Sequence, residues 1–141
     1  MYKKILLPTD GSKYADEEAE RARRLLDDGG EIIVLSVAGK LTSTAFQFRS
    51  NVRKINKELY EEAEKNVEHM LSLFDDSMNV TGRVEEGFAA ETIIRVAEEE
   101  NADLIIISAT GKSGLHRFIL GSVTEQVLKT SEIDVLLVPN K

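Results

Sequence analysis

Glycines and a serine near the end of the chain have a spacing that suits phosphate binding. Gly111, Gly114 and Gly121 precede Ser122 and Val123, which begin a predicted helix. Glycine lets the backbone approach a ligand closely, and successive backbone N–H groups form an anion-binding nest. The Ser122 hydroxyl would lie at the positive end of the helix dipole. These parts predict a polyphosphate site; the alternative is that Ser122 only caps the helix and the glycines only form turns.

Two common phosphate-binding motifs are excluded. The motif G-x-x-x-x-G-K-[ST] follows a first strand, and here it would need glycine at position 106, ahead of Gly111-Lys112-Ser113. That position is Ile106, inside a predicted strand. The dinucleotide fingerprint G-x-G-x-x-G is absent as well, so the glycines of this chain belong to a different arrangement.

A second group with chemical potential follows the first apolar run. Pro8, Thr9 and Asp10 lead into Gly11-Ser12, a sequence typical of a tight turn. The Asp10 carboxylate could contact a ligand at the end of a strand, or it could cap the first helix.

The elements that must position these residues alternate regularly between strand and helix. Runs of apolar residues indicate parallel strands covered on both faces, and apolar stripes of helical period lie between them. Gly29-Gly30 is predicted to end the first helix, and Ser122 with Glu125 matches a capping box. The predicted strands are 3–9, 31–37, 79–85, 103–109 and 134–138, and the predicted helices are 14–26, 51–74, 89–100 and 122–130.

This alternation predicts an α/β fold: a doubly wound, five-stranded parallel sheet, Rossmann-like, with helices on both faces. If the first strand lies where the winding reverses, it neighbours the fourth, and the order is 3-2-1-4-5. In such sheets the ligand lies beyond the carboxyl ends of the strands, where the winding direction reverses. The turn containing Asp10 and the segment from Gly111 onward should meet there.

Length and charge narrow the function classes. The 141 residues suggest one domain, 1–141. A net charge of −7 argues against a nucleic-acid partner, although 104–124 contains no acid and carries Lys112, His116 and Arg117. Cysteine is absent, no apolar run is long enough for a membrane span, and no signal peptide is indicated. A cytoplasmic protein is expected.

The chain resembles the universal stress protein family, in its ATP-binding branch. That family carries the signature G-x2-G-x9-G-[ST], and Gly111, Gly121 and Ser122 match its later positions. The first glycine of the signature corresponds to Ser108. The opening Ile5-Leu6-Leu7-Pro8-Thr9-Asp10 and the closing Val135-Leu136-Leu137-Val138-Pro139 are also similar to the family.

The resemblance implies an ATP site, with ADP or AMP as further ligands and Mg²⁺ or Mn²⁺ bridging the phosphates. Asp10, beside Pro8, would anchor the ribose or adenine end. Val37 would offer backbone groups to the adenine, and Ile107 and Ser108 would line the nucleoside side. The phosphates would be held by Gly111, Gly121, Ser122 and Val123.

The resemblance also implies a homodimer through strand 134–138, which agrees with an apolar edge strand that is only lightly guarded by charge. ATP hydrolysis, if present, is expected to be slow, because no residue is clearly placed to activate water. The competing interpretations are a dimerisation module of the same family without nucleotide, favoured by Ser108, an adenylyl-transfer enzyme, and a phospho-receiver domain. Phe46 and Phe48 could cover the base or pack on the protein surface.

Overall fold

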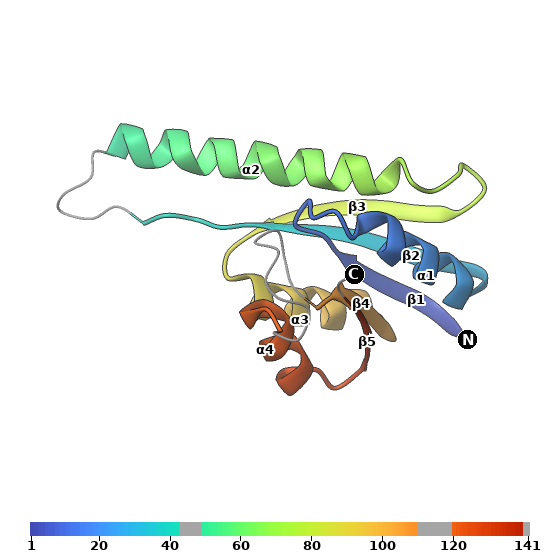
Figure 1. The fold of residues 1–141 in the computed structure, drawn as a ribbon. Helices are drawn as coiled ribbons and strands as arrows, with labels where there is room; N and C mark the ends of the chain where they lie inside the picture. Colours follow the sequence, from blue (N-terminus) through green and yellow to red (C-terminus); the bar gives the residue numbers. More distant parts are fainter. Residues whose placement is uncertain (43–48, 110–119, 140–141) are drawn as a thin grey trace.

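A computed structural model describes residues 1–42, 49–109 and 120–139 as a five-stranded parallel sheet with helices on both faces (Figure 1). The strand order is β3-β2-β1-β4-β5, as the sequence predicts. The strands are β1 (Tyr2–Pro8), β2 (Leu26–Ala38), β3 (Asn79–Glu86), β4 (Leu104–Ser108) and β5 (Asp134–Val138). The helices are α1 (Ala15–Leu25), α2 (Arg49–Leu71), α3 (Ala89–Glu100) and α4 (Ser122–Thr130).

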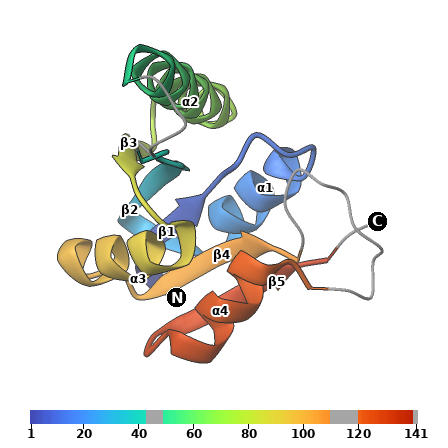
Figure 2. The same cartoon turned by 90° about the vertical axis from the view of Figure 1, so that its left-hand side faces the viewer.

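Helices α1 and α2 cover one face of the sheet, and α3 and α4 cover the other (Figure 2). Alternate residues of each strand therefore enter different cores. On β4, Leu104 and Ile106 pack with the α1 and α2 side, whereas Ile105 and Ile107 pack with α3 and α4. The central strands are apolar on both faces for this reason. None of the helices in the described ranges is long and apolar enough to span a membrane.

The sheet reverses its winding between β1 and β4. Ile5 and Leu6 of β1 pair with Leu104 and Ile105 of β4, while the same strand pairs with β2 on its other side. All the pairs are parallel, so the carboxyl ends of these strands share one edge of the sheet. This is the edge where a doubly wound sheet binds its ligands.

The prediction that Gly29-Gly30 ends the first helix is wrong. Helix α1 ends at Leu25, and β2 begins at the next residue. The register with β1 then shifts between Tyr2 and Lys4. Gly29 has a φ of +76°, and a Cβ on Gly30 would lie 2.8 Å from the Lys3 carbonyl oxygen. The glycines therefore serve the irregular part of the strand rather than the end of the helix.

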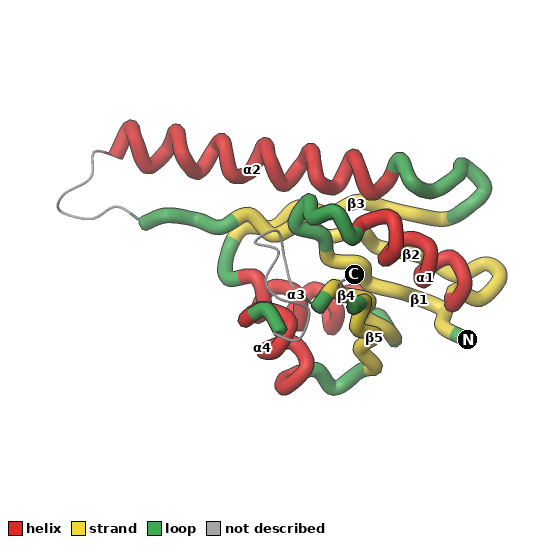
Figure 3. Tube along the Cα trace, viewed as in Figure 1, coloured by secondary structure: helices red, strands yellow, loops and turns green. Residues whose placement is uncertain are grey.

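Helix α2 is the longest helix and extends past the body of the sheet (Figure 3). The segment after β2 runs beside its first half, where the Asn56 side chain makes two hydrogen bonds with the Leu41 backbone. Its amide nitrogen donates to the Leu41 carbonyl at 3.0 Å, and its oxygen accepts from the Leu41 N–H at 2.7 Å.

Candidate functional site

The turn after β1 is held by short-range hydrogen bonds. The Thr9 N–H continues the pairing with β2 through the Leu35 carbonyl oxygen at 2.8 Å. The Ser12 N–H donates to Asp10 Oδ1 at 3.0 Å, and Gly11 adopts a φ of +81°. Asp10 is exposed. Its carboxylate organises the turn and does not cap α1, whose N-cap is Tyr14.

The end of β4 is fixed from two directions. The Ala109 N–H donates to the Val138 carbonyl of β5, and the Ala109 carbonyl accepts from the Gly121 N–H, both at 2.8 Å. The Thr124 hydroxyl donates to the Ser108 carbonyl at 2.8 Å, in a buried position. The start of α4 is therefore attached to the carboxyl end of β4.

Gly121 is the N-cap of α4, with φ of −65° and ψ of 152°. The predicted capping box is wrong, because Ser122 is the first residue inside the helix and the described residues give this helix no side-chain cap. Ser122 is exposed and Val123 is half-buried. The first N–H groups of a helix have no acceptor within it, so the amides of Ser122 and Val123 suit an anion. The Gly121 N–H is already donated to Ala109.

One residue that the sequence analysis missed connects the two turns. Glu18 on α1 is only 1% exposed. Its carboxyl is hydrogen-bonded to the Ser108 side chain and lies within electrostatic range of Asp10. A signal was present in the sequence, because position 18 belongs to the same helical stripe as Ala15, Ala19 and Ala22. A glutamate in an otherwise apolar stripe marks a buried carboxyl.

Burial is the main cause of an unusual pKa at this position. Loss of solvent raises the pKa of Glu18 well above its usual range, and the nearby Asp10 raises it further. The Ser108 hydrogen bond acts in the opposite direction. A chain of interactions thus joins the β1 turn to the first turn of α4: Asp10 acts on Glu18 electrostatically, and hydrogen bonds link Glu18 to Ser108 and Ser108 to Thr124.

The remaining predicted residues either lie near the strand ends or fall outside the described ranges. Pro8 is buried at the end of β1 and pairs with Leu35. Val37, Ile107 and Val123 lie on the α3 and α4 side of the sheet. Gly111 lies outside the described residues, as do Gly114, Lys112, His116, Arg117, Phe46 and Phe48.

Two further kinds of possible ligand site among the described residues are clustered metal ligands and a surface groove. Within the described ranges, no three histidines, aspartates or glutamates come together as metal ligands. A groove of about 280 Å³ lies between α3 and α4, lined by residues such as Ile94 and Gln126. It belongs to the helical layer and does not include any of the predicted nucleotide-site residues.

The sequence is similar to a known protein family and to individual members of it. Residues 1–139 match the Universal stress protein family. Universal stress protein MJ0531 of Methanocaldococcus jannaschii is 31% identical over 140 residues, which cover 98% of this chain and 82% of that protein. MJ0577 of the same organism is 34% identical over 161 residues, covering 100% of this chain and 97% of the relative.

Solved structures agree with the fold. The MJ0577 structure has a TM-score of 0.85 and covers 100% of this chain and 98% of its own. An Arabidopsis thaliana universal stress family protein with AMP bound has a TM-score of 0.60 at 17% identity, covering 96% of this chain and 90% of its own. At that identity the likeness extends to the fold alone.

Proposed function

The chain belongs to the universal stress protein family, and on that premise we propose that it binds an adenine nucleotide at the carboxyl ends of β1 and β4. The observation that carries the proposal is the chain of interactions from Asp10, through its electrostatic effect on Glu18, to the hydrogen-bonded Ser108 and Thr124. It brings together the two turns that the sequence assigned to opposite ends of one ligand. The AMP-bound Arabidopsis protein has the same fold.

The phosphate end of the ligand is assigned to the first turn of α4. Ser122 offers an exposed hydroxyl and, with Val123, backbone amides that have no acceptor inside the helix. The dipole of this nine-residue helix favours a negative charge at its N-terminus. Gly121 contributes close backbone approach rather than its N–H, which the Ala109 carbonyl already accepts. Gly111 completes this assignment by its place in the family signature.

The nucleoside end is assigned to Asp10, Val37, Ile107 and Ser108. Asp10 is exposed beside Pro8, where a ribose hydroxyl could be its partner. Val37 lies near the end of β2 and Ile107 near the end of β4. A Mg²⁺ or Mn²⁺ ion, if bound, would be held mainly by phosphate oxygens and water, as Mg²⁺ often is.

Calorimetric titration and thermal shift with ATP, ADP and AMP test the proposal, with and without Mg²⁺. At 100 times its dissociation constant, a ligand stabilises the folded state by about 2.7 kcal/mol. Gly121→Val should abolish this stabilisation by placing a side chain against the phosphates, and Ser122→Ala should weaken binding roughly tenfold by removing one hydroxyl. Ser131→Ala is the matched control, because Ser131 lies at the other end of α4.

An unchanged affinity in Gly121→Val would place the phosphates elsewhere. The absence of heat and of thermal shift for every nucleotide would overturn nucleotide binding altogether.

A second candidate function is a dimerisation module without nucleotide. Ser108 favours it, because the family signature has glycine there and Ser108 is buried against Glu18. The same titration separates the two candidates, since this second function predicts no nucleotide effect in wild-type protein.

We also propose that the chain forms a homodimer through β5. Val135, Leu136 and Leu137 are each half-buried in the single chain, and β5 is an edge strand. A second copy of β5 would cover these side chains and pair the free edge. Mass determination by light scattering across a concentration series gives the test.

A further inference from the structure

Glu18 differs from the other acids of α1. Asp16 and Glu20 are exposed and Glu17 is half-buried, whereas Glu18 is 1% exposed. Its Oε2 atom, like that of Glu17, is buried without a hydrogen-bond partner among the described residues. A buried carboxyl that lacks a cationic partner is costly to ionise. A buried carboxyl without a cationic partner, next to a proposed ligand site, suggests a role in ligand binding.

The surroundings of Glu18 come from three elements. In the β1 turn, the exposed Asp10 lies within electrostatic range and contributes a negative charge. From β4, the uncharged Ser108 hydroxyl is its hydrogen-bond partner. Ser108 has the same parity on β4 as Leu104 and Ile106, which pack toward α1 and α2, so its side chain is directed to the helix that carries Glu18.

The other groups near this end of α1 do not neutralise Glu18. On α1, Tyr14 lies one turn earlier, and Arg21 donates to the Glu17 carbonyl at 3.2 Å. Helix α2 approaches the β1 turn with the uncharged Asn66, whose oxygen would lie 2.4 Å from a Cβ on Gly11. The charged neighbours Glu62 and Lys65 on α2 are exposed. The electrostatic surroundings given by the described residues are therefore negative.

These surroundings favour the neutral acid. Burial raises the pKa of Glu18 well above its usual range, and Asp10 adds to the effect. The neutral carboxyl can both accept a hydrogen bond and donate one, so it can hold the Ser108 hydroxyl without placing charge under the site. An ionised Glu18 would add a second negative charge beside Asp10.

We propose that Glu18 is a positioning residue of the nucleotide site: its neutral carboxyl holds the Ser108 hydroxyl beneath the nucleoside end, and loss of its proton weakens nucleotide binding. This inference rests on the proposed function. It assigns a role to the serine that replaces the first glycine of the family signature. The ligand is an anion, so its affinity depends directly on whether Glu18 is charged.

The test measures the dissociation constants of AMP and ATP between pH 5.5 and 9 in wild-type protein and in Glu18→Gln. Glutamine keeps the size and hydrogen bonding of the neutral acid and cannot ionise. The ratio of the two constants at each pH cancels the titration of the nucleotide itself. The ratio should be near one at pH 5.5, and wild-type binding should become about tenfold weaker than Glu18→Gln by pH 9. The change should be greater for ATP than for AMP.

Glu20→Gln is the matched control, because Glu20 is exposed on the same helix. It should keep the wild-type pH profile. A second measurement needs no variant: the carbon-13 chemical shift of the Glu18 carboxyl gives its pKa with and without nucleotide. Binding and protonation are linked reciprocally, so saturation with ATP should raise this pKa.

The outcomes separate the two proposals. If wild-type protein binds nucleotide but Glu18→Gln follows the same pH profile, or the pKa of Glu18 is unchanged by ATP, Glu18 has only a structural role and the inference is wrong. If wild-type protein binds no nucleotide at any pH, the proposed function fails and this inference fails with it.

Discussion

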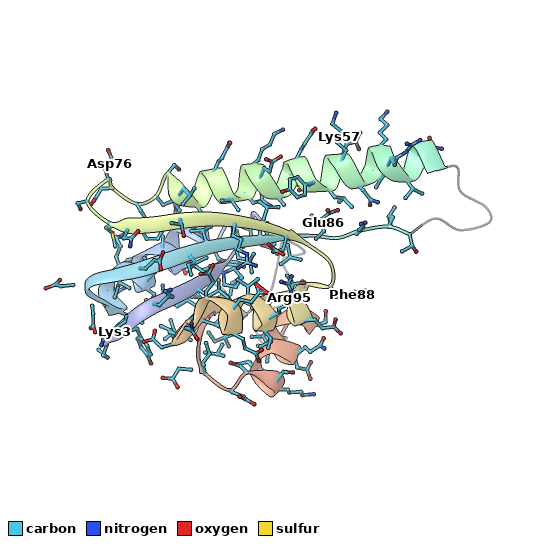
Figure 4. The ribbon with its side chains drawn as sticks, turned by 180° about the vertical axis from the view of Figure 1, so that it is seen from behind. Lys3, Lys57, Asp76, Glu86, Phe88 and Arg95 are labelled. Carbon is cyan, nitrogen blue, oxygen red and sulfur yellow. The ribbon has the colours of Figure 1, made fainter. Side chains whose placement is uncertain are left out.

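β3 and β5 lie at opposite edges of one sheet, yet their side chains differ in character. Arg83 on β3 donates to Glu85, Glu99 and Glu100 at 3.0, 2.5 and 3.2 Å, and Arg95 on α3 joins Glu85 and Glu99 at 3.0 and 2.9 Å. Figure 4 shows Arg95 on the α3 side of the sheet, near the bend that carries Phe88. The β3 edge is therefore guarded by charge.

The β5 edge has fewer charges. Between Asp134 and the buried Val138 it presents a run of half-buried aliphatic side chains. Asp134 accepts a hydrogen bond from the Tyr2 hydroxyl at 2.7 Å, which engages its carboxylate with β1. The charged β3 edge is therefore suited to solvent, and the apolar β5 edge is suited to pairing with a second strand.

The covered side of β3 gives the largest expected effect. A Cβ on Gly82 would lie 2.5 Å from Val67 Cγ1 on α2. Gly82→Val should therefore lower the free energy of unfolding by about 1–3 kcal/mol through overpacking. Urea unfolding measures the change. Gly39→Val is the control, because no atom lies within 4 Å of the Cβ position at Gly39. Equal stability of both variants would mean that α2 is not packed tightly on β3.

The apolar edge is tested next. Leu136→Lys should weaken the proposed dimer by tenfold or more, because a charge would enter the interface. Light scattering measures the mass over a concentration series. Thr81→Lys, on the exposed surface of β3, is the matched control and should leave the mass unchanged. If only Thr81→Lys dissociated the dimer, the interface would lie at β3 rather than at β5.

A smaller effect is expected from the charged edge. Arg83→Met should lower the free energy of unfolding by about 1 kcal/mol, since Arg83 is the centre of a partly exposed network. Hydrogen bonds from Arg83, then from Arg95, hold the pKa of both Glu85 and Glu99 below the usual range. The contribution of Glu85 and Glu99 to the free energy of unfolding is present above their unfolded pKa of about 4.3. It is lost as the pH falls through their pKa values in the folded protein.

The acid branch of the stability curve therefore provides the measurement for Arg83→Met. Wild-type protein should lose stability more steeply than the variant as the pH falls below about 5. Parallel curves would show that the network contributes nothing that depends on ionisation.

The smallest effect concerns the start of β5. The hydrogen bond to Asp134, followed by burial and nearby negative charge, raises the pKa of Tyr2 above its usual value. Asp134→Asn should return this pKa toward about 10, and an NMR titration of the tyrosine ring carbons measures it. Tyr60, exposed on α2, serves as the internal reference. No movement of the Tyr2 signal would contradict the contact.

Local patterns predicted most of the fold. The apolar runs indicated the five strands, and placing the first strand where the winding reverses gave their order. Helices α3 and α4 have the bounds that their periodicity and flanking residues indicated. The wrong details lie at the ends of elements: β2 begins at Leu26 rather than at residue 31, and α2 spans Arg49–Leu71 rather than 51–74. Gly29-Gly30 looked like a helix end, but Gly29 has a positive φ within the strand and Gly30 lies too close to the Lys3 carbonyl for a side chain.

The candidate site was less predictable than the fold. Glycine spacing located the first turn of α4, and the turn after β1 located Asp10. The stripe of α1 marks Glu18 as a buried carboxyl, but its role depends on Ser108, far along the chain, and no local pattern indicates that partner. The capping box also depended on context, since Gly121 rather than Ser122 occupies the N-cap.

Ser108 is fastened on both sides of the sheet: its side chain to α1 through Glu18, and its carbonyl to α4 through Thr124. A movement of this residue cannot be absorbed by one layer alone. Any occupant that displaces it must move two helices that lie on opposite faces of the sheet (Figure 2). Ser108 thus links the two helical layers, and nucleotide binding should slow amide hydrogen exchange in α1 and α4 together.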